Sequence, residues 1–523
     1  MSSLITTPTP NRASRRSHAR RGGAVGAGAL LVTGSAAALL TAFAGSAGAS
    51  TTITVDSNSD GAANAANCTD ITPGNCTLRD AALAAIDGDT INFDASISLI
   101  TLTAGTVQTQ AVNIIGPGAS ALTITTTGEP GAYSMFRVGG TGDALISGVT
   151  LTKNRVKALN EGKFTFDDVT VSGSSSSYGG ALYAGNTGDL EVKNSTFENN
   201  EASSNGGAVY VYNSGEATIS DSVFKDNDAE DTGGAIYIFG ADLTLTRTQV
   251  TGNTAQESGG GVYFGPSVDN VSIADSTIDS NTAEEYGGGA YFGDVSNVLI
   301  STTTVSNNSA IGGAGLDFGG DAIDATINNS TISANAAVYG GGGIYISPTS
   351  SITINQSTIS ANTSAGTTLG FSGGGITIGS ATSVVTMSGT IVSGNSSALA
   401  GTADFGLYSE DPADTGSFAA TNSIIGEVDS RITVNGTNNV SSTSPMLGAL
   451  ANNGGSTKTM ALLTGSPAID AGPNPVAEFT GNQFDQRGPG YARIVGGLVD
   501  IGAFEIQSSS EPATDPVAPS FTG

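Results

Sequence analysis

The chain has 523 residues, of which 74 are glycine and none is tryptophan, and its net charge at neutral pH is −28. Residues 1–49 hold five of the 18 basic residues and none of the 46 acidic ones, so residues 50–523 carry 13 − 46 = −33. A chain this acidic repels phosphate backbones, which excludes nucleic acid as a partner. The single histidine, His18, lies within residues 1–49. Histidine bases, Ser-His-Asp triads and histidine metal ligands are therefore excluded from residues 50–523.

Residues 1–49 have the pattern of a signal peptide, with five arginines between positions 12 and 21, an Ala, Gly and Leu stretch, and a small-residue site at Ala47-Gly48-Ala49. An uncleaved anchor helix is the alternative, and the glycines throughout the stretch favour cleavage. We expect an exported protein, secreted or held at the cell surface, with no transmembrane segment after cleavage. In such a compartment Cys68 and Cys76, eight residues apart, are expected to form a disulfide.

From residue 179 to 378 one unit recurs. It consists of two or three glycines, an apolar residue, a position that is usually tyrosine, and another apolar residue. The tyrosine column consists of Tyr183, Tyr210, Tyr237, Tyr263, Tyr291, Asp317, Tyr345 and Thr377, at intervals of 27, 27, 26, 28, 26, 28 and 32 residues. A fixed period of this length predicts a solenoid. The short runs between the glycines alternate Val, Ile, Thr and Phe with polar residues, which indicates strands. We therefore predict an all-β fold, a single-stranded right-handed parallel β-helix with one coil per ~27 residues over 91–440.

Alternation also predicts which columns face the core. The positions on both sides of the tyrosine column are always apolar, and successive side chains of a strand point to opposite faces. The tyrosines should therefore form a ladder on the outside. A second column is expected to be structural, because asparagine tolerates a left-handed backbone at corners and its amide can bond along the stack. It consists of Asn200, Asn227, Asn253, Asn281, Asn308, Asn335, Asn362 and Asn395.

Both ends of the chain resemble known modules of bacterial surface proteins. Cys76-Thr77-Leu78-Arg79-Asp80-Ala81 resembles the CSLREA domain, with Thr77 and Asp80 as conservative departures. The segments 466–472, 485–488 and 499–505 resemble the choice-of-anchor Q domain, and the repeats between resemble those of polymorphic outer membrane proteins, taken to be pectin-lyase-like. The resemblance implies a disulfide-containing N-terminal cap over 50–90, with a turn or two of helix, and a C-terminal cap over 441–505 that closes the solenoid. Residues 506–523 would be a disordered Ser- and Pro-rich tail.

Two sets of acidic residues are candidates for chemistry. Asp167-Asp168 is the one adjacent pair of aspartates on a coil, but neighbours on a strand point apart, and the segments that accompany such a pair in polygalacturonases are missing. Asp231, Glu257 and Glu285 fall at the same position of three successive coils, so their like charges are stacked and repel one another. A shared Ca²⁺ would relieve this repulsion if the side chains converge. If the side chains point apart, they are simply solvated carboxylates. Calcium is therefore the one cofactor that we consider.

A weaker calcium pattern and two basic residues complete the candidates. Asp56, Asn58 and Asp60 follow the first half of a calcium loop, but Asn67 stands where the loop needs a glutamate, and an Asx-rich turn before the disulfide is the alternative. We expect Arg79 to satisfy backbone carbonyls of the N-terminal cap. Arg487 is expected to pair with Asp500 and Glu505 in the C-terminal cap.

The tyrosine column admits two interpretations, a packing ladder that stabilises the sheet and an aromatic strip that binds a sugar or a protein. The candidate binding residues are Tyr183, Tyr210, Tyr237, Tyr263, Tyr291 and Tyr345. We expect a monomeric, non-catalytic surface or matrix protein whose partner is a glycan or another surface protein. A polysaccharide lyase or hydrolase and a purely structural spacer are the alternatives.

Overall fold

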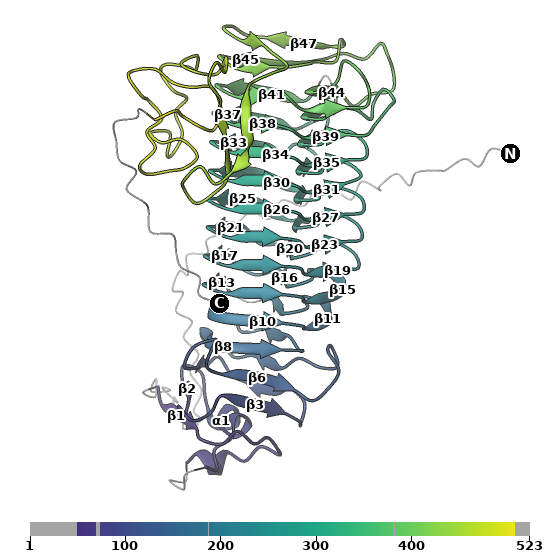
Figure 1. The fold of residues 1–523 in the computed structure, drawn as a ribbon. Coiled ribbons are helices and arrows are strands. Elements are labelled where there is room, and N and C mark those ends of the chain that lie inside the picture. The colour runs from purple at the N-terminus through teal and green to yellow at the C-terminus, as the bar shows by residue number, and fades with distance from the viewer. Residues whose placement is uncertain (1–49, 70–73, 187, 381, 508–523) are drawn as a thin grey trace, which may run out of the picture. The chain divides into compact units, whose positions relative to one another are not determined.

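The computed structural model describes residues 50–69, 74–186, 188–380 and 382–507 (Figure 1). The expected signal peptide lies outside these residues, as does all but the first part of the expected tail. The described chain winds as a right-handed parallel β-helix, so the predicted fold class is confirmed. No helix within the described ranges is long and apolar enough to cross a membrane.

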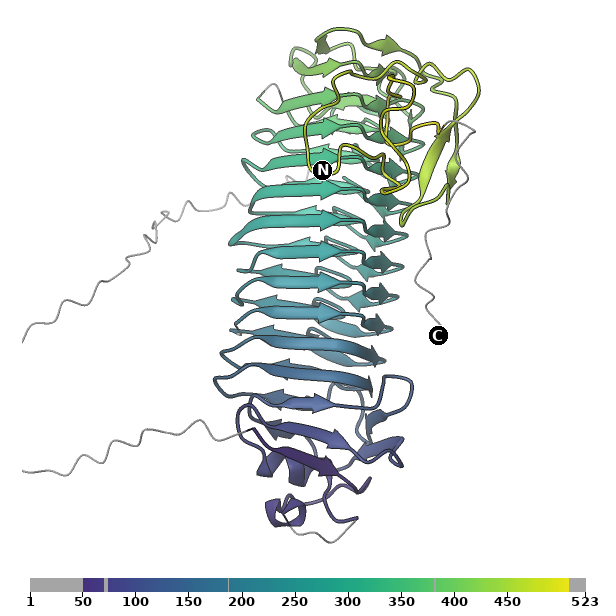
Figure 2. The ribbon, with the colours of Figure 1, turned by 90° about the vertical axis from the view of Figure 1, so that its left-hand side faces the viewer.

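Each regular coil contributes two strands to one long sheet, then one strand to each of two others, and every strand pairs in parallel with its counterpart one coil away (Figures 1 and 2). The sheet that carries the tyrosine column, here the tyrosine sheet, comprises β4 (Val107–Thr109), β7 (Phe136–Val138), β9 (Val156–Ala158), β12 (Leu182–Gly185), β16 (Val209–Tyr212), β20 (Ile236–Phe239), β24 (Val262–Phe264), β28 (Ala290–Phe292), β32 (Leu316–Phe318), β36 (Ile344–Ile346), β40 (Ile376–Ile378) and β44 (Phe405–Leu407).

The smallest of the three parallel sheets forms the corner before the glycine runs. It comprises β11 (Ser175–Tyr178), β15 (Glu201–Asn205), β19 (Asp228–Ala229), β23 (Thr254–Ala255), β27 (Thr282–Ala283), β31 (Ser309–Ala310), β35 (Ala336–Ala337), β39 (Thr363–Ser364) and β43 (Ser396–Ser397).

The long sheet bends within each coil and holds the remaining parallel strands. It comprises β1 (Thr52–Val55), β2 (Thr90–Phe93), β3 (Leu99–Leu102), β5 (Asn113–Ile115), β6 (Thr123–Thr126), β8 (Ala144–Thr152), β10 (Phe164–Ser172), β13 (Leu190–Lys193), β14 (Thr196–Glu198), β17 (Ala217–Ser220), β18 (Val223–Lys225), β21 (Leu243–Thr246), β22 (Gln249–Thr251), β25 (Val268–Ala274), β26 (Thr277–Asp279), β29 (Val295–Ser301), β30 (Thr304–Ser306), β33 (Asp324–Asn328), β34 (Thr331–Ser333), β37 (Ser351–Asn355), β38 (Thr358–Ser360), β41 (Val384–Ser388), β42 (Ile391–Val392), β45 (Gly416–Thr421), β46 (Ile424–Ile425), β47 (Ile432–Asn435) and β48 (Val440–Ser441).

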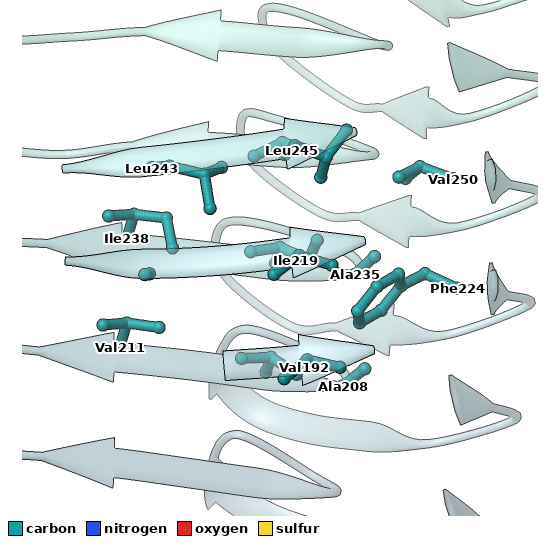
Figure 3. Close-up of a cluster of buried hydrophobic side chains, with 14 of the residues drawn as sticks. Val192, Ala208, Val211, Ile219, Phe224, Ala235, Ile238, Leu243, Leu245 and Val250 are labelled. Atoms are coloured by element: carbon teal, nitrogen blue, oxygen red, sulfur yellow. The ribbon is translucent and has the colours of Figure 1, made fainter. Parts of the chain in front are cut away.

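The core runs along the axis of the helix and is filled by the inward columns of the long sheet and the tyrosine sheet (Figure 3). Buried alanines of the smallest sheet, among them Ala283, Ala310 and Ala337, form a separate cluster. Val211 and Ile238 from the tyrosine sheet face Ile219 and Leu245 from the long sheet, and all four are fully buried. Because a parallel sheet repeats the same side of each strand in every coil, one alternating pattern suffices to build a continuous apolar interior.

The asparagine column forms a buried ladder, as predicted. Asn281 Nδ2 donates to Asn308 Oδ1 at 3.0 Å and to the carbonyl of Val250 at 2.9 Å, and Asn281 Oδ1 accepts from the backbone and side chain of Asn253. The left-handed residue of each corner is the one before the ladder, for example Ser280 with φ 58°. Our expectation of a left-handed backbone at the asparagine itself was wrong, because the ladder amides require the asparagine to continue the stack.

The N-terminal segment carries the helices and the disulfide. The 3₁₀ helix η1 (Ala65–Cys68) precedes α1 (Leu78–Ala84), whose capping box joins Thr77 and Asp80. Cys68 and Cys76 are disulfide-bonded, as expected. A helical turn at this position and the disulfide both follow the sequence pattern.

The C-terminal segment packs against the side of the β-helix, beside β30, β34 and β38 (Figures 1 and 2). It contains the antiparallel pair β49 (Leu447–Ala451) and β50 (Thr459–Leu462). Gln486 Oε1 accepts from Thr331 at 2.5 Å, and Arg493 donates to Asn329 Oδ1 at 2.6 Å. The expectation that this segment closes the end of the solenoid therefore fails, because its contacts lie along the flank and bury outward hydroxyls there.

Candidate functional site

The tyrosine column forms an outward, half-buried ladder on the tyrosine sheet. The residues pair in register from Tyr183 to Tyr291, and both neighbours of each tyrosine on its strand are fully buried. Ring centroids of Tyr210, Tyr237 and Tyr263 lie 5.0 and 5.1 Å apart with interplanar angles of 5° and 3°. Burial raises the pKa of the Tyr237 hydroxyl to about 12, so it stays protonated.

Parallel stacking changes what this ladder can offer a ligand. Each ring within it covers the face of its neighbour, so only ring edges and hydroxyls point to the solvent. A sugar stacks on the face of an aromatic ring rather than on its edge. The ladder therefore offers a free face only where the stack ends.

The stack ends at Asp317, which occupies the tyrosine position of β32. Asp317 pairs in register with Tyr291 on one side and with Tyr345 on the other. Rungs of a sheet are about 4.8 Å apart, so the two tyrosines are separated by about two rungs. The aspartate is shorter than a tyrosine, and the gap above it is one aromatic ring thick.

Asp317 is buried without a partner. Its side chain is 2% exposed, and its carboxyl group has no hydrogen bond or ion pair with any described residue. Burial raises the pKa of this carboxyl group well above its usual range. The glycine run makes room for it, since a Cβ on Gly313 would lie 2.2 Å from Asp317 Oδ2.

A pocket of about 230 Å³ opens over this carboxyl group. Its walls are aromatic and come from four coils: Tyr286, Tyr291, Tyr339, Tyr345, Phe371 and Tyr408. Three of these rings meet at angles, since Tyr408 contacts Tyr345 at 5.4 Å and 84° and Phe371 at 5.9 Å and 85°. Tyr286, Tyr339 and Tyr408 are 47%, 49% and 44% exposed, so the rim is open to solvent.

The acidic column runs along the corner that leads to this pocket. The backbone of Glu257 donates to Asp231 and accepts from Glu285, so the three residues are stacked in register. Burial, together with the neighbouring Asp231 and Glu285, raises the pKa of the Glu257 carboxyl group. Glu285 precedes Tyr286, a wall of the pocket. Among the described residues no group of three or more acidic, histidine or cysteine side chains converges to hold a metal, and calcium binding stays a prediction.

The other acidic candidates are engaged in the fold. Asp167 accepts from Asn194 at 2.8 Å, whereas Asp168 sits at a left-handed position with φ 55°, so this pair shares no site. Asp60 pairs with Arg79 at 2.8 Å. Asp56 accepts from the backbone of Gly74 and Cys76. Both carboxylates that a calcium loop would need in this segment, Asp56 and Asp60, are therefore already bonded within the protein.

The basic candidates are structural as well. Arg79 donates to the carbonyls of Gly105 and Thr106, as predicted. Arg487 pairs with Asp485 at 2.6 Å instead of the carboxylates of Asp500 and Glu505.

The buried Glu505 and Arg493 form part of the C-terminal packing instead. Burial raises the pKa of Glu505 to about 8, and its Oε2 accepts from the backbone of Asp500. Arg493, which donates to the carbonyl of Gly502, lies 4.0 Å from Glu505. These groups face the flank of the β-helix rather than the solvent.

Sequence reasoning placed Tyr291 and Tyr345 in the site and missed the rest of the pocket. The sequence does mark the site at Asp317, because a carboxyl group there interrupts a column of tyrosines. Tyr286 and Tyr339 also share a signal, since each stands immediately before a glycine. Phe371 belongs to the coil whose interval is 32 residues, and the added length carries it to the rim.

Comparison with known families agrees with the fold. A family model described as "Right handed beta helix region" matches residues 50–254, 207–395 and 250–443. No curated protein matches the chain.

Solved structures with a similar fold are distant. The Azotobacter vinelandii mannuronan C-5 epimerase AlgE6 A-module is 14% identical, covers 69% of this chain and 93% of its own, and has a TM-score of 0.39. A PL6 alginate lyase in complex with a trisaccharide is 12% identical, covers 88% and 97%, and has a TM-score of 0.37. Pectate lyase Pel9A is 14% identical, covers 88% and 96%, and has a TM-score of 0.28.

Proposed function

The chain belongs to the right-handed β-helix family, and from that premise we propose that it is an exported, non-catalytic glycan-binding protein whose binding site is the aromatic pocket over Asp317. The observation that carries the proposal is the interruption of the tyrosine ladder. Asp317 leaves a gap one ring thick between Tyr291 and Tyr345, and the rings at the gap present faces that the rest of the ladder cannot.

A sugar ring fits the chemistry of this gap. Its flat apolar face can stack on Tyr291 or Tyr345, and its hydroxyls can meet the phenol groups at the rim and the carboxyl group at the floor. The gap opens sideways between exposed tyrosines, so one unit of a longer chain can enter while the chain continues along the outer face. These features favour a polymer over a small metabolite.

The lining of the pocket does not favour catalysis. Glycosidases place two carboxyl groups on opposite sides of the scissile bond. Among the described residues that line the pocket, Asp317 is the one carboxyl group, and there is no lysine or arginine to serve as a base for elimination. Binding without turnover is the simpler function for this set of side chains.

Export is supported by the sequence of residues 1–49 and by the disulfide between Cys68 and Cys76, since disulfides persist in oxidising compartments. Calcium at Asp231, Glu257 and Glu285 is proposed only as a modulator of binding. The protein would act at the cell surface or in the medium around it.

A polysaccharide panel tests the proposal. The protein is passed over immobilised neutral, acidic and amino polysaccharides with and without calcium, and both retention and chain cleavage are scored. Retention that Asp317→Tyr abolishes is expected, since tyrosine would fill the gap. Cleavage of any member would overturn the proposal in favour of a lyase or hydrolase, and no retention on any member would favour a spacer.

A further inference from the structure

We infer that the pocket selects a glycan with free amino groups and that the protonated amino group of one sugar unit binds Asp317. This inference rests on the proposed glycan-binding function and names the class of glycan. It follows from three independent features of the described residues: an unpartnered acceptor, an aromatic enclosure and a row of acidic side chains that leads to it.

The unpartnered acceptor is the first feature. Asp317 is 2% exposed and aims into the pocket, yet no described residue donates to it. A buried polar group without a partner is costly, and a ligand that supplies donors recovers that cost. A primary ammonium group brings three N–H donors and a positive charge, and charge-assisted hydrogen bonds are stronger than neutral ones.

The aromatic enclosure is the second feature. The faces of aromatic rings carry partial negative charge and attract cations, and ammonium groups are bound in this way by cages of several rings. Six rings line the pocket over the carboxyl group, four of them on β28, β36 and the segments just before two glycine runs. A neutral acetamido group would gain neither the cation–π attraction nor the charge pairing.

Charge is the third feature. Residues 50–523 carry a net charge of −33, which attracts a polycation and repels a uronate polymer. The stacked row of Asp231, Glu257 and Glu285 ends beside Tyr286 at the pocket, with one carboxyl group per rung. The row therefore adds negative charge at the approach to the pocket, where it attracts a polycation.

A hydrogen-bond donor distinguishes this ligand from other cations. A quaternary ammonium group would fill an aromatic cage but has no N–H to satisfy Asp317. A lysine side chain carries the donors but lacks the flat face that fits between Tyr291 and Tyr345. An amino sugar supplies both in one unit.

Binding is coupled to a proton. Burial raises the pKa of Asp317, so at a pH below that pKa the carboxyl group of the free protein holds its proton. On binding, this proton leaves to the solvent while the carboxylate pairs with the ammonium group. The titratable groups that line the pocket with Asp317 are Tyr286 and Tyr339 from the corner, Tyr291 from β28, Tyr345 from β36 and Tyr408 after β44. Burial raises the pKa of Tyr286, Tyr291 and Tyr345, so these phenols remain neutral and Asp317 supplies the proton.

Calorimetric titration of the protein tests the inference. A glucosamine oligomer, its fully N-acetylated counterpart and a glucose oligomer of equal length are titrated at mildly acidic pH, in two buffers with different enthalpies of ionisation. We expect the glucosamine oligomer to bind about tenfold to a hundredfold more tightly than the acetylated one, with up to one proton released per site. Asp317→Asn should remove both the preference and the proton release.

A matched control separates local from long-range charge. Asp294 is exposed beside the ladder and does not line the pocket, so Asp294→Asn removes the same charge from the same region. The preference should survive in this variant. Equal binding of the glucosamine and acetylated oligomers overturns the inference and leaves the glycan-binding function intact. An equal loss of the preference in Asp317→Asn and in Asp294→Asn has the same meaning. Failure of all three oligomers together with an empty polysaccharide panel overturns the proposed function itself.

Discussion

Asp317 pairs in register with Tyr291, so the tyrosine ladder of the β-helix ends on a buried carboxyl group rather than on another ring. The carboxyl group and the free ring face arise from one substitution in the repeat. A site of this kind needs no dedicated domain, because the neighbouring coils hold every wall in place.

Replacement of Asp317 by tyrosine should complete the ladder. Tyr263 and Tyr291 show that the column accepts a tyrosine on successive rungs, with centroids 5.2 Å apart. The new ring would stack on Tyr291 and remove an unpartnered buried carboxyl group, so we expect the free energy of unfolding to rise by about 0.5–1.5 kcal/mol from the aromatic pair alone. Urea unfolding measures it. A loss of stability would show that the gap is not one ring thick.

The stability difference between Asp317→Asn and the wild type should depend on pH. The carboxyl group of Asp317 has a raised pKa in the folded state, so the folded state binds more protons than the unfolded state between the two pKa values. Wild-type stability is therefore lost as the pH rises from about 3.9, the unfolded value, through the folded pKa. The wild type loses about 1.4 kcal/mol of its free energy of unfolding for each unit of pKa shift, and the variant does not.

Thermal or urea unfolding of both proteins across this pH range checks the sign. The variant should match the wild type most closely at low pH and become the more stable protein as the pH rises. A difference that stays constant with pH would mean that Asp317 titrates normally in the folded protein.

Loss of one asparagine from the buried ladder should destabilise the coils on both sides. Asn281→Ala removes amide bonds to Asn308, Asn253 and the carbonyl of Val250. A buried polar group without a hydrogen-bond partner costs about 1–3 kcal/mol, and we expect the free energy of unfolding to fall by this amount or more. Thr282→Ala, one residue away and exposed, is the control and should change the unfolding midpoint little. Equal effects would mean that the ladder adds nothing beyond the corner itself.

The C-terminal segment should detach from the flank when Arg493 is replaced by alanine. Arg493 is fully buried and donates to Asn329 of the β-helix and to Gly502 of its own segment. Its removal leaves the Asn329 Oδ1 and the Gly502 carbonyl without this donor, and unmet buried polar groups cost about 1–3 kcal/mol each. Hydrogen exchange should rise across 441–506 while the coils stay protected. Unchanged protection of that segment would contradict the assigned contacts.

The repeat could be predicted from the sequence because each coil obeys one local rule. Val209 and Val211 flank Tyr210 as apolar neighbours, and that alternation alone places the tyrosine outside. The ladder of Asn281 and Asn308 follows from the period, since residues one period apart must stack. Fold class and ladder positions therefore need no knowledge of distant contacts.

The pocket and the packed flank could not be predicted in the same way. Phe371 and Tyr408 reach the rim from coils that are longer than the period, and their direction depends on backbone that no repeat specifies. The hydroxyls of Thr304 and Thr331 look like solvent-facing positions in the sequence, yet the C-terminal segment buries them. Both features depend on how separate segments meet in space.

The comparison of Tyr291→Ala with Tyr237→Ala in one binding assay tests the central claim most directly. Both variants remove a stacked ring from the same column, but Tyr291 has a face at the gap, and Tyr237 lies between two rings. With the glycan that the panel identifies, affinity should fall by about tenfold for Tyr291→Ala and stay near the wild-type value for Tyr237→Ala. An equal or larger loss for Tyr237→Ala would contradict the account and assign binding to the ladder as a whole.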